Sequence, residues 1–245
     1  DVYEVIEYHP NACFLEFAET VVNARRQGDV DPSKAVVAET MKLIGNSAYG
    51  KTITNKEKFR NISICRDTEA PILINSQHFR QLNQIGEDVC EVEMSKKSIK
   101  MDLPIQIGFF VYGYAKLRML AFYYDFIAKY IAKEDFQYCA MDTDSAYIAL
   151  SGPFDSLIKP TMQEEFERER QTWLPRNDTE EHRRFDKRQP GLFKEEWRGS
   201  GIVSLCSKTY YCFGAKDKYS CKGVNKKQQQ KPLTASRYLG VLKTT

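Results

Sequence analysis

The sequence has no apolar run long enough to cross a bilayer, no paired-cysteine motif and no secretory leader pattern. Its longest uncharged stretch near the middle, residues 103–115, is shorter than the roughly 20 apolar residues of a membrane helix, so we expect no membrane partner. The seven cysteines are scattered, with no C-x-x-C pair and no histidine at zinc spacing. This argues against a disulfide framework or a structural zinc site and favours a reducing, intracellular compartment. Each cysteine is expected to be an ordinary buried thiol.

What the sequence does contain is enough apolar material for a core. Hydrophobic residues make up 42% and charged residues 28% of its 245 residues, which suggests a chain of one or two domains. Residues 199–245 carry nine basic and one acidic side chain, interleaved with aromatics. Such a segment is either a phosphate-binding surface or a solvated lysine-rich tail. The first residue is Asp rather than Met, so we expect the chain to be a piece of a longer protein.

Local signals predict a mixture of helices and short strands. Asp31 can cap a helix that begins at Pro32, and Gly50 is a natural stop, so a helix is expected over about 32–49. The other expected elements, in chain order, are short strands and loops over 51–102 (including 61–64 and 71–74), a helix over about 106–133, a β-hairpin of strands 136–140 and 146–150, an exposed mixed-charge helix and loop over 163–198, and a strand region over 202–213. The fold class predicted is α+β, with mostly antiparallel strands and packed helices.

The turn of the predicted hairpin carries Asp142-Thr143-Asp144-Ser145. Residues i and i+2 of an extended segment point to the same side, so the carboxylates of Asp142 and Asp144 would repel each other. A divalent cation would relieve that repulsion, and hard oxygen ligands suit Mg²⁺. Asp and Ser are also common turn residues, so the tetrad alone is explained as well by turn formation as by metal binding.

One face of the predicted helix over 32–49 has the chemistry to bind a nucleotide. Lys42, Asn46 and Tyr49 stand at i, i+4 and i+7, and Lys34 lies two turns earlier near the same face. An ammonium, an amide and an aromatic ring in a row match the phosphates, sugar and base of a nucleoside triphosphate. The alternative for each residue is an ordinary position on an amphipathic helix.

Together these motifs resemble those of family B DNA polymerases. Residues 42–50, KLIGNSAYG, are similar to the fingers motif K-x-x-x-N-S-x-Y-G, and residues 142–145, DTDS, are similar to the palm motif, in the same order along the chain. By residue counting, the chance of both in one chain is on the order of one in millions. The resemblance extends from about residue 34 to 226 and is closest to the protein-primed organellar, viral and transposon branch.

Two short elements of the basic C-terminal segment add to this resemblance. Residues 207–210, SKTY, are similar to the K-x-Y element that holds the primer, and Lys222-Gly223 is similar to a following K-G element. The resemblance implies fingers over 1–55, a palm over 56–226 and the start of a truncated thumb over 227–245. Residues 51–102 correspond either to an insertion that wraps the template or, more plainly, to a palm strand and loop.

The resemblance implies a DNA-directed DNA polymerase that acts in DNA replication, a nucleotidyltransferase using two Mg²⁺ ions. Asp144 would be a direct metal ligand, and Asp142 a ligand or supporting carboxylate. The partners would be a DNA primer–template, a dNTP and a terminal priming protein. The other implied roles are nucleotide binding for Lys34, Lys42, Asn46 and Tyr49, and DNA binding for Lys208, Thr209, Tyr210 and Lys222.

The second carboxylate strand of the family, D-x-x-S-L-Y-P, is not found in the sequence, nor is an exonuclease domain. We therefore expect this chain alone to be inactive or nearly so. The alternative function is a mobile-element relic that binds DNA without catalysis. An unrelated RNA-binding domain would carry RNP-type or G-x-x-G signatures, and neither occurs in the sequence.

Overall fold

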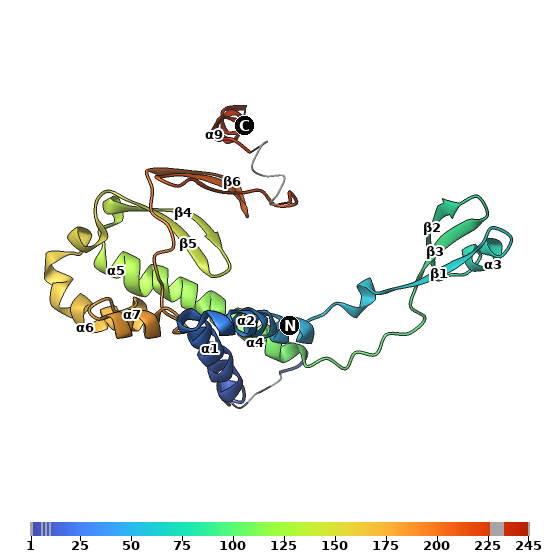
Figure 1. The fold of residues 1–245 in the computed structure, drawn as a ribbon, viewed down its shortest axis with the longest axis horizontal. Coiled ribbons are helices and arrows are strands. Elements are labelled where there is room, and N and C mark those ends of the chain that lie inside the picture. Colours follow the sequence, from blue (N-terminus) through green and yellow to red (C-terminus); the bar gives the residue numbers. More distant parts are fainter. Residues whose placement is uncertain (1, 6, 8, 10, 226–232, 245) are drawn as a thin grey trace. The chain divides into compact units, whose positions relative to one another are not determined.

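The computed structural model describes residues 2–5, 7, 9, 11–225 and 233–244. Helices and antiparallel strands are mixed along the chain (Figure 1), which confirms the predicted α+β class. The chain forms two compact units: residues 43–111, and residues 1–42 together with 112–245. The predicted boundaries at 55/56 and 226/227 stay predictions, and residues 226–232 lie outside the described residues. Among the described residues, no helix is both long and apolar enough to cross a membrane.

The N-terminal helices follow the predicted capping. Helix α1 spans Leu15–Val30 and is followed by a 3-10 turn, η1, over Pro32–Lys34. The Asp31 side chain accepts a hydrogen bond from the Ser33 amide and Pro32 occupies the first position, as predicted. Helix α2 then spans Ala35–Thr52. The predicted stop at Gly50 is wrong, because Gly50 keeps helical backbone and α2 continues for two more residues.

The unit of residues 43–111 contains a three-stranded antiparallel sheet in the order β1-β3-β2. Ala70, Cys90 and Val92 form its small buried core. The strand predicted at 71–74 is instead a short helix, because Pro71 stands in the first turn, where its fixed φ suits a helix. The elements of this unit are η2 Lys56–Lys58, β1 Arg60–Arg66, α3 Ala70–Ile74, β2 Phe79–Gly86 and β3 Val89–Ser95.

The predicted long helix is present in three consecutive segments. Helix α4 spans Ile105–Ala121, a π-helical segment η3 spans Phe122–Ile127, and α5 spans Ala128–Tyr130. The π-helical segment was not expected, and its aromatic residues supply the centre of the main core. The buried members of that core are Phe122, Phe126, Ile127, Tyr130, Ile131, Ile158, Phe166 and Trp173.

The predicted hairpin is also present. Strand β4 spans Phe136–Asp142, strand β5 spans Ser145–Leu150, and the two pair antiparallel. Tyr123 of η3 makes edge-to-face contacts with Phe136 and Tyr138 of β4, at ring-centroid distances of 6.0 and 5.4 Å. The hairpin therefore packs on the aromatic part of the helix, which gives its turn a rigid support.

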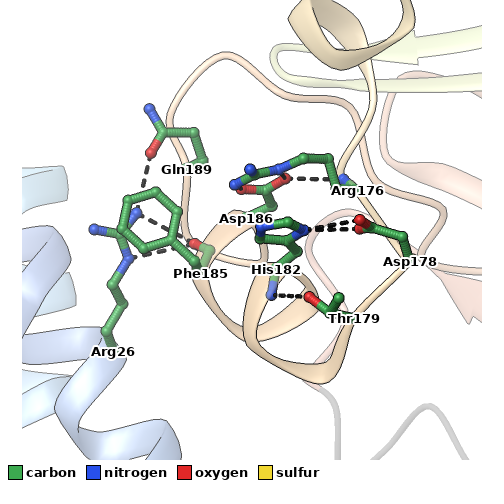
Figure 2. A network of polar contacts seen from close by, with 8 residues as sticks. All are labelled: Arg26, Arg176, Asp178, Thr179, His182, Phe185, Asp186 and Gln189. Atoms are coloured by element: carbon green, nitrogen blue, oxygen red, sulfur yellow. Dashed lines mark hydrogen bonds and ion pairs between the residues drawn. The ribbon is translucent and has the colours of Figure 1, made fainter. Parts of the chain in front are cut away.

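The mixed-charge segment over 163–198, predicted as one exposed helix and a loop, contains two helices, and part of it is less exposed than expected. Asp186 is only 5% exposed, and Arg176 compensates its buried charge by donating from its backbone amide and two guanidinium nitrogens, each at 2.8 Å. Figure 2 shows Arg26 of α1 stacked on Phe185 while donating to its carbonyl oxygen. The elements here are η4 Lys133–Asp135, η5 Phe154–Leu157, η6 Pro160–Met162, α6 Gln163–Trp173 and α7 Glu180–Asp186.

The last part of the chain forms a third sheet, in the order β6-β7-β8. Strand β6 spans Gly201–Cys206, β7 Thr209–Phe213 and β8 Lys218–Ser220, and helix α9 spans Ala235–Thr244. Tyr238 of α9 packs on Val203 and Tyr211 in a separate buried cluster and donates to the Ser220 carbonyl at 2.7 Å. The predicted strand region over 202–213 is thus a hairpin of β6 and β7.

Candidate functional site

The turn at Asp142–Ser145 has an unusual backbone. Asp142 pairs with Ser145, so Thr143 and Asp144 form a two-residue turn. The Asp144 amide donates to the Asp142 carbonyl at 2.6 Å and Thr143 has φ +50°. A positive φ at a β-branched residue is rare and costs about 1–3 kcal/mol. The regular alternation of strand β4 ends at Asp142, so alternation along a strand does not determine where the Asp144 carboxylate points relative to that of Asp142.

A second strained turn lies beside the first. Ser207 and Lys208 join β6 to β7, and Lys208 has φ +62°. Thr143 and Lys208 are the two residues other than glycine with positive φ in the described part of the chain. Their turns meet through the Lys208 ammonium, which lies 3.2 Å from Oδ1 of Asp142. Backbone strain of this kind clusters at binding and catalytic sites.

The ion pair between Lys208 and Asp142 is weak enough to exchange. The Lys208 side chain is 54% exposed and that of Asp142 is 29% exposed. Pairs with this exposure contribute about 0–1 kcal/mol, because water and salt screen the charges. A metal ion or a phosphate could therefore replace either partner at little cost.

A cavity of about 300 Å³ opens between the two hairpins. Its lining joins Asp142 of the DTDS turn to residues of the SKTY element, which are far apart in the sequence. The lining residues are Cys139, Ala140, Met141, Asp142, Tyr147, Ser204, Leu205, Cys206, Ser207, Lys208 and Tyr210. Two of the motifs found in the sequence therefore share one concave surface.

Two tyrosines form the aromatic part of this cavity. The rings of Tyr147 on β5 and Tyr210 on β7 lie 5.0 Å apart. Burial, together with the adjacent Tyr147 hydroxyl, raises the pKa of Tyr210 to about 12. The Lys218 ammonium lies 5.5 Å from the centre of the Tyr147 ring. The site thus combines neutral aromatic surface with positive charge.

The remaining predicted DNA-binding residues lie on the same sheet. Thr209 accepts a hydrogen bond from the Lys222 amide at 3.3 Å, which ties the K-x-Y and K-G elements together. Lys216, Lys218 and Lys222 form no ion pair with any carboxylate among the described residues. Their uncompensated charge suits contact with a phosphate backbone.

The two carboxylates of the turn differ in exposure. Asp142 is partly buried and Asp144 is exposed. Mg²⁺ is commonly held by one or two carboxylates, with water and substrate phosphates completing its octahedron. Among the described residues, no group of three or more His, Cys, Asp or Glu side chains could hold a metal ion. Asp142 and Asp144 can thus contribute ligands but need other donors.

The predicted nucleotide-binding residues lie outside the lining of this cavity. Lys42 pairs with Glu39 at 3.1 Å on the same helix, and Lys34 donates to Oε1 of Gln27 at 3.3 Å. Asn46 is exposed and Tyr49 is half-buried. All but Lys34 lie within α2, and Lys34 ends the turn before it. The helical spacing was therefore predicted correctly, and the role of this face in nucleotide binding stays a prediction.

Sequence reasoning missed Tyr147 and Lys218 as parts of the site. Tyr147 follows Ser145 by two positions on β5, so strand alternation from the DTDS turn could have indicated it. Lys218 could only have been noticed as one of many lysines in the basic segment.

No protein-family model, curated protein or solved structure matches this chain.

Proposed function

We propose that this chain is part of a family B-type DNA polymerase, a DNA-directed enzyme that adds a dNTP to the 3′-hydroxyl of a primer. One observation carries the proposal: Asp142 of the DTDS turn and Lys208 of the K-x-Y element meet at 3.2 Å across one cavity. Polymerase chemistry needs a carboxylate and a primer-holding cation next to each other. A turn motif formed only by local propensity has no reason to meet the second motif.

The side chains around the cavity have complementary tasks in this proposal. Lys208 would leave Asp142 and bind the phosphate nearest the primer terminus. Tyr210, which lines the cavity beside Tyr147, would hydrogen-bond to the terminal nucleotide and hold it in orientation. Lys218 and Lys222 would bind phosphates further along the primer, since phosphate contacts fix register without reading sequence.

Asp142 and Asp144 would hold Mg²⁺ together with carboxylates from outside the described residues. Two such ions, when bound, would activate the 3′-hydroxyl and neutralise the charge that develops on the pyrophosphate. Asp142 would exchange its partner Lys208 for the metal. This exchange makes metal binding and primer binding interdependent, because the same ammonium leaves the carboxylate and joins the primer.

The α2 face would bind the incoming nucleotide. Lys42 would release Glu39 and neutralise the triphosphate, and Asn46 and Tyr49 would pack and hydrogen-bond along the sugar and base. The Lys42–Glu39 pair is exposed, at 42% and 64%, so its loss costs little. A terminal protein as primer is part of the same proposal, on the resemblance to the protein-primed branch alone.

The second candidate function is a DNA-binding relic without catalysis. The specific observation in its favour is that Lys216, Lys218 and Lys222 form no ion pair with a carboxylate among the described residues. In this case these lysines of β8 and its flanking loops would bind duplex DNA, and α2 would have no role in nucleotide binding.

The experiment that separates these functions is nucleotide-dependent DNA binding. A primer–template with a dideoxy-terminated primer is titrated by fluorescence anisotropy in Ca²⁺, with the next correct dNTP, an incorrect dNTP or none. A polymerase predicts tighter binding with the correct dNTP, and loss of that gain in Lys42→Ala and Tyr49→Ala but not in the exposed Lys133→Ala. Equal affinity under all three conditions would favour the relic.

Primer extension tests directly whether the proposed metal site of Asp142 and Asp144 is incomplete in this chain. We expect no extension product from this chain with Mg²⁺ and all four dNTPs, because Asp142 and Asp144 lack further carboxylate donors. Robust synthesis by the chain, abolished by Asp144→Asn, would overturn the expectation that the site is incomplete. It would leave the proposed polymerase function standing.

A further inference from the structure

Cys65 and Cys90 bring two thiols together in the sheet of the unit formed by residues 43–111. They are directly opposite in the antiparallel pairing of β1 with β3, and their Sγ atoms lie 3.6 Å apart. Directly opposed residues in antiparallel strands have Cα atoms about 4.5 or 5.5 Å apart. Both spacings fall within the range of about 4.4–6.8 Å that a disulfide spans. A bond between these sulfurs therefore needs side-chain rotation and no change of strand register.

The two thiols differ in access. Cys90 is fully buried beside Val92 and Ala70, whereas Cys65 is only partly buried at the margin of that cluster. Burial, followed by the contact with Cys65, raises the pKa of Cys90 to about 11. An oxidant from solvent thus reaches Cys65 first, and Cys90 is held against it as an intact thiol.

We propose that Cys65 and Cys90 form a redox site in which a peroxide converts two thiols into a cross-strand disulfide. The Cys65 sulfur attacks the peroxide, the O–O bond breaks, and Cys65 becomes a sulfenic acid with release of water. The Cys90 sulfur then displaces the sulfenic oxygen, which leaves as a second water with the thiol proton. Two electrons pass from the two sulfurs to the peroxide, and a thiol reductant reverses the change.

The disulfide would cross-link a sheet that has only a small hydrophobic core. The cluster under this sheet contains three buried residues, and small sheets with so few depend on cross-links for order. The bond would link the edge strand β1 to the middle strand β3 and close a loop that contains α3 and β2. We expect slower amide exchange along β1 and β3 after oxidation, because restricting the opened state opposes local unfolding. This inference does not depend on the proposed polymerase function.

The test is oxidation of the full chain with hydrogen peroxide at one equivalent or less, followed by alkylation and non-reducing peptide mapping. The expected product is a peptide pair joined through Cys65 and Cys90, lighter than the two peptides by two hydrogen atoms and separated by dithiothreitol. Hydrogen exchange on the same sample is expected to slow in β1 and β3 and to return to its starting rate after reduction.

Cys65→Ser is the main variant, since this partly buried position accepts a hydroxyl more readily than the buried Cys90. It should lose both the cross-linked peptide and the change in exchange, while Cys13→Ser at an exposed site keeps both. The proposal is overturned if Cys65 and Cys90 are both recovered alkylated after Cys13 and Cys206 have been oxidised. It is equally overturned if Cys65 accumulates as a sulfinic acid without a cross-link.

Discussion

The α2 face and the cavity between the hairpins contain the two sets of motif residues that resemble family B DNA polymerases. The interactions that position these residues differ between the two regions. On α2, Lys42 is paired with Glu39, three residues away on the same helix. At the cavity, Asp142 contacts Lys208 from a different sheet, and both turns contain strained backbone. Residues on one helix share a face whenever the helix forms, whereas two strained turns meet only if the tertiary fold brings them together.

Because of this difference, the cavity supports the proposed function more strongly than the α2 face does. Helical spacing alone would give the α2 face in many unrelated helices. The meeting of Asp142 and Lys208 requires the π-helical aromatics to support β4 and the β6–β8 sheet to carry the second turn. The cavity is therefore the stronger evidence, and its geometry should be sensitive to the core behind it.

The largest expected effect comes from removing that support. Phe126 is fully buried and stacks on Phe122 and Trp173, each at 5.4 Å between ring centroids. Phe126→Ala should lower the free energy of unfolding by about 3–5 kcal/mol in urea denaturation followed by circular dichroism. Phe109→Ala, where the side chain is 71% exposed, should change it by less than about 0.5 kcal/mol. Similar costs for both variants would show that Phe126 contributes no more to stability than an exposed aromatic residue.

The ion pairs that join α1 to the end of α7 should have the next largest effect. Hydrogen bonding from Arg188, at 2.6 Å, lowers the pKa of Asp29 to about 2. The ionised carboxylate thus stabilises the folded chain above the unfolded pKa of about 3.9, and this stabilisation is lost as the pH falls towards 2. Asp29→Asn should cost about 1–2 kcal/mol at neutral pH and flatten the stability profile between about pH 4 and 2. The exposed Asp88→Asn serves as control, and an unchanged acid limb in Asp29→Asn would refute the assignment.

A smaller effect of opposite sign tests the strain at the DTDS turn. Thr143→Gly should raise the free energy of unfolding by about 0.5–1 kcal/mol, because glycine accepts φ +50° without steric cost. The same change within α1, Thr20→Gly, should lower it by about 0.3–0.5 kcal/mol, because glycine is a poorer helix former than threonine by about that amount. Thermal denaturation of the two variants measures both signs. A destabilised Thr143→Gly would mean that the turn is not strained.

The smallest effect is expected on the α2 face. Glu39→Ala removes the partner of Lys42 from an exposed pair and should change stability by less than about 0.5 kcal/mol. Denaturant midpoints with and without 0.5 M added salt would measure this. A loss of stability as large as that of Asp29→Asn would show that the Lys42–Glu39 pair is not the weak, exposed pair described for the α2 face.

Much of the fold could be predicted from local sequence signals. The Asp31-Pro32 cap, the long aromatic helix and the hairpin at 142–145 each depend on neighbouring residues, and each is present. The errors occurred where local signals were ambiguous. Pro71–Ile74 is too short for its periodicity to distinguish a strand from a helical turn, and Gly50 can remain helical where no left-handed residue is required.

The candidate site was only partly predictable for a related reason. The sequence motifs identified Asp142 and Lys208 separately, but their contact depends on how two sheets pack. The positive φ angles of Thr143 and Lys208 have no sequence signal, because neither residue is glycine or asparagine. The facing thiols of Cys65 and Cys90 likewise depend on the register of β1 against β3, which spacing along the chain does not determine.

The central claim is that Lys208 beside Asp142 receives a primer terminus, and end-specific DNA binding tests it most directly. Affinity is measured for a recessed 3′ primer–template and for a blunt duplex of the same length and sequence. We predict tighter binding to the recessed end, with this preference lost in Lys208→Ala and kept in Lys133→Ala. Equal affinity for both DNAs, or a preference unchanged by Lys208→Ala, would contradict the account.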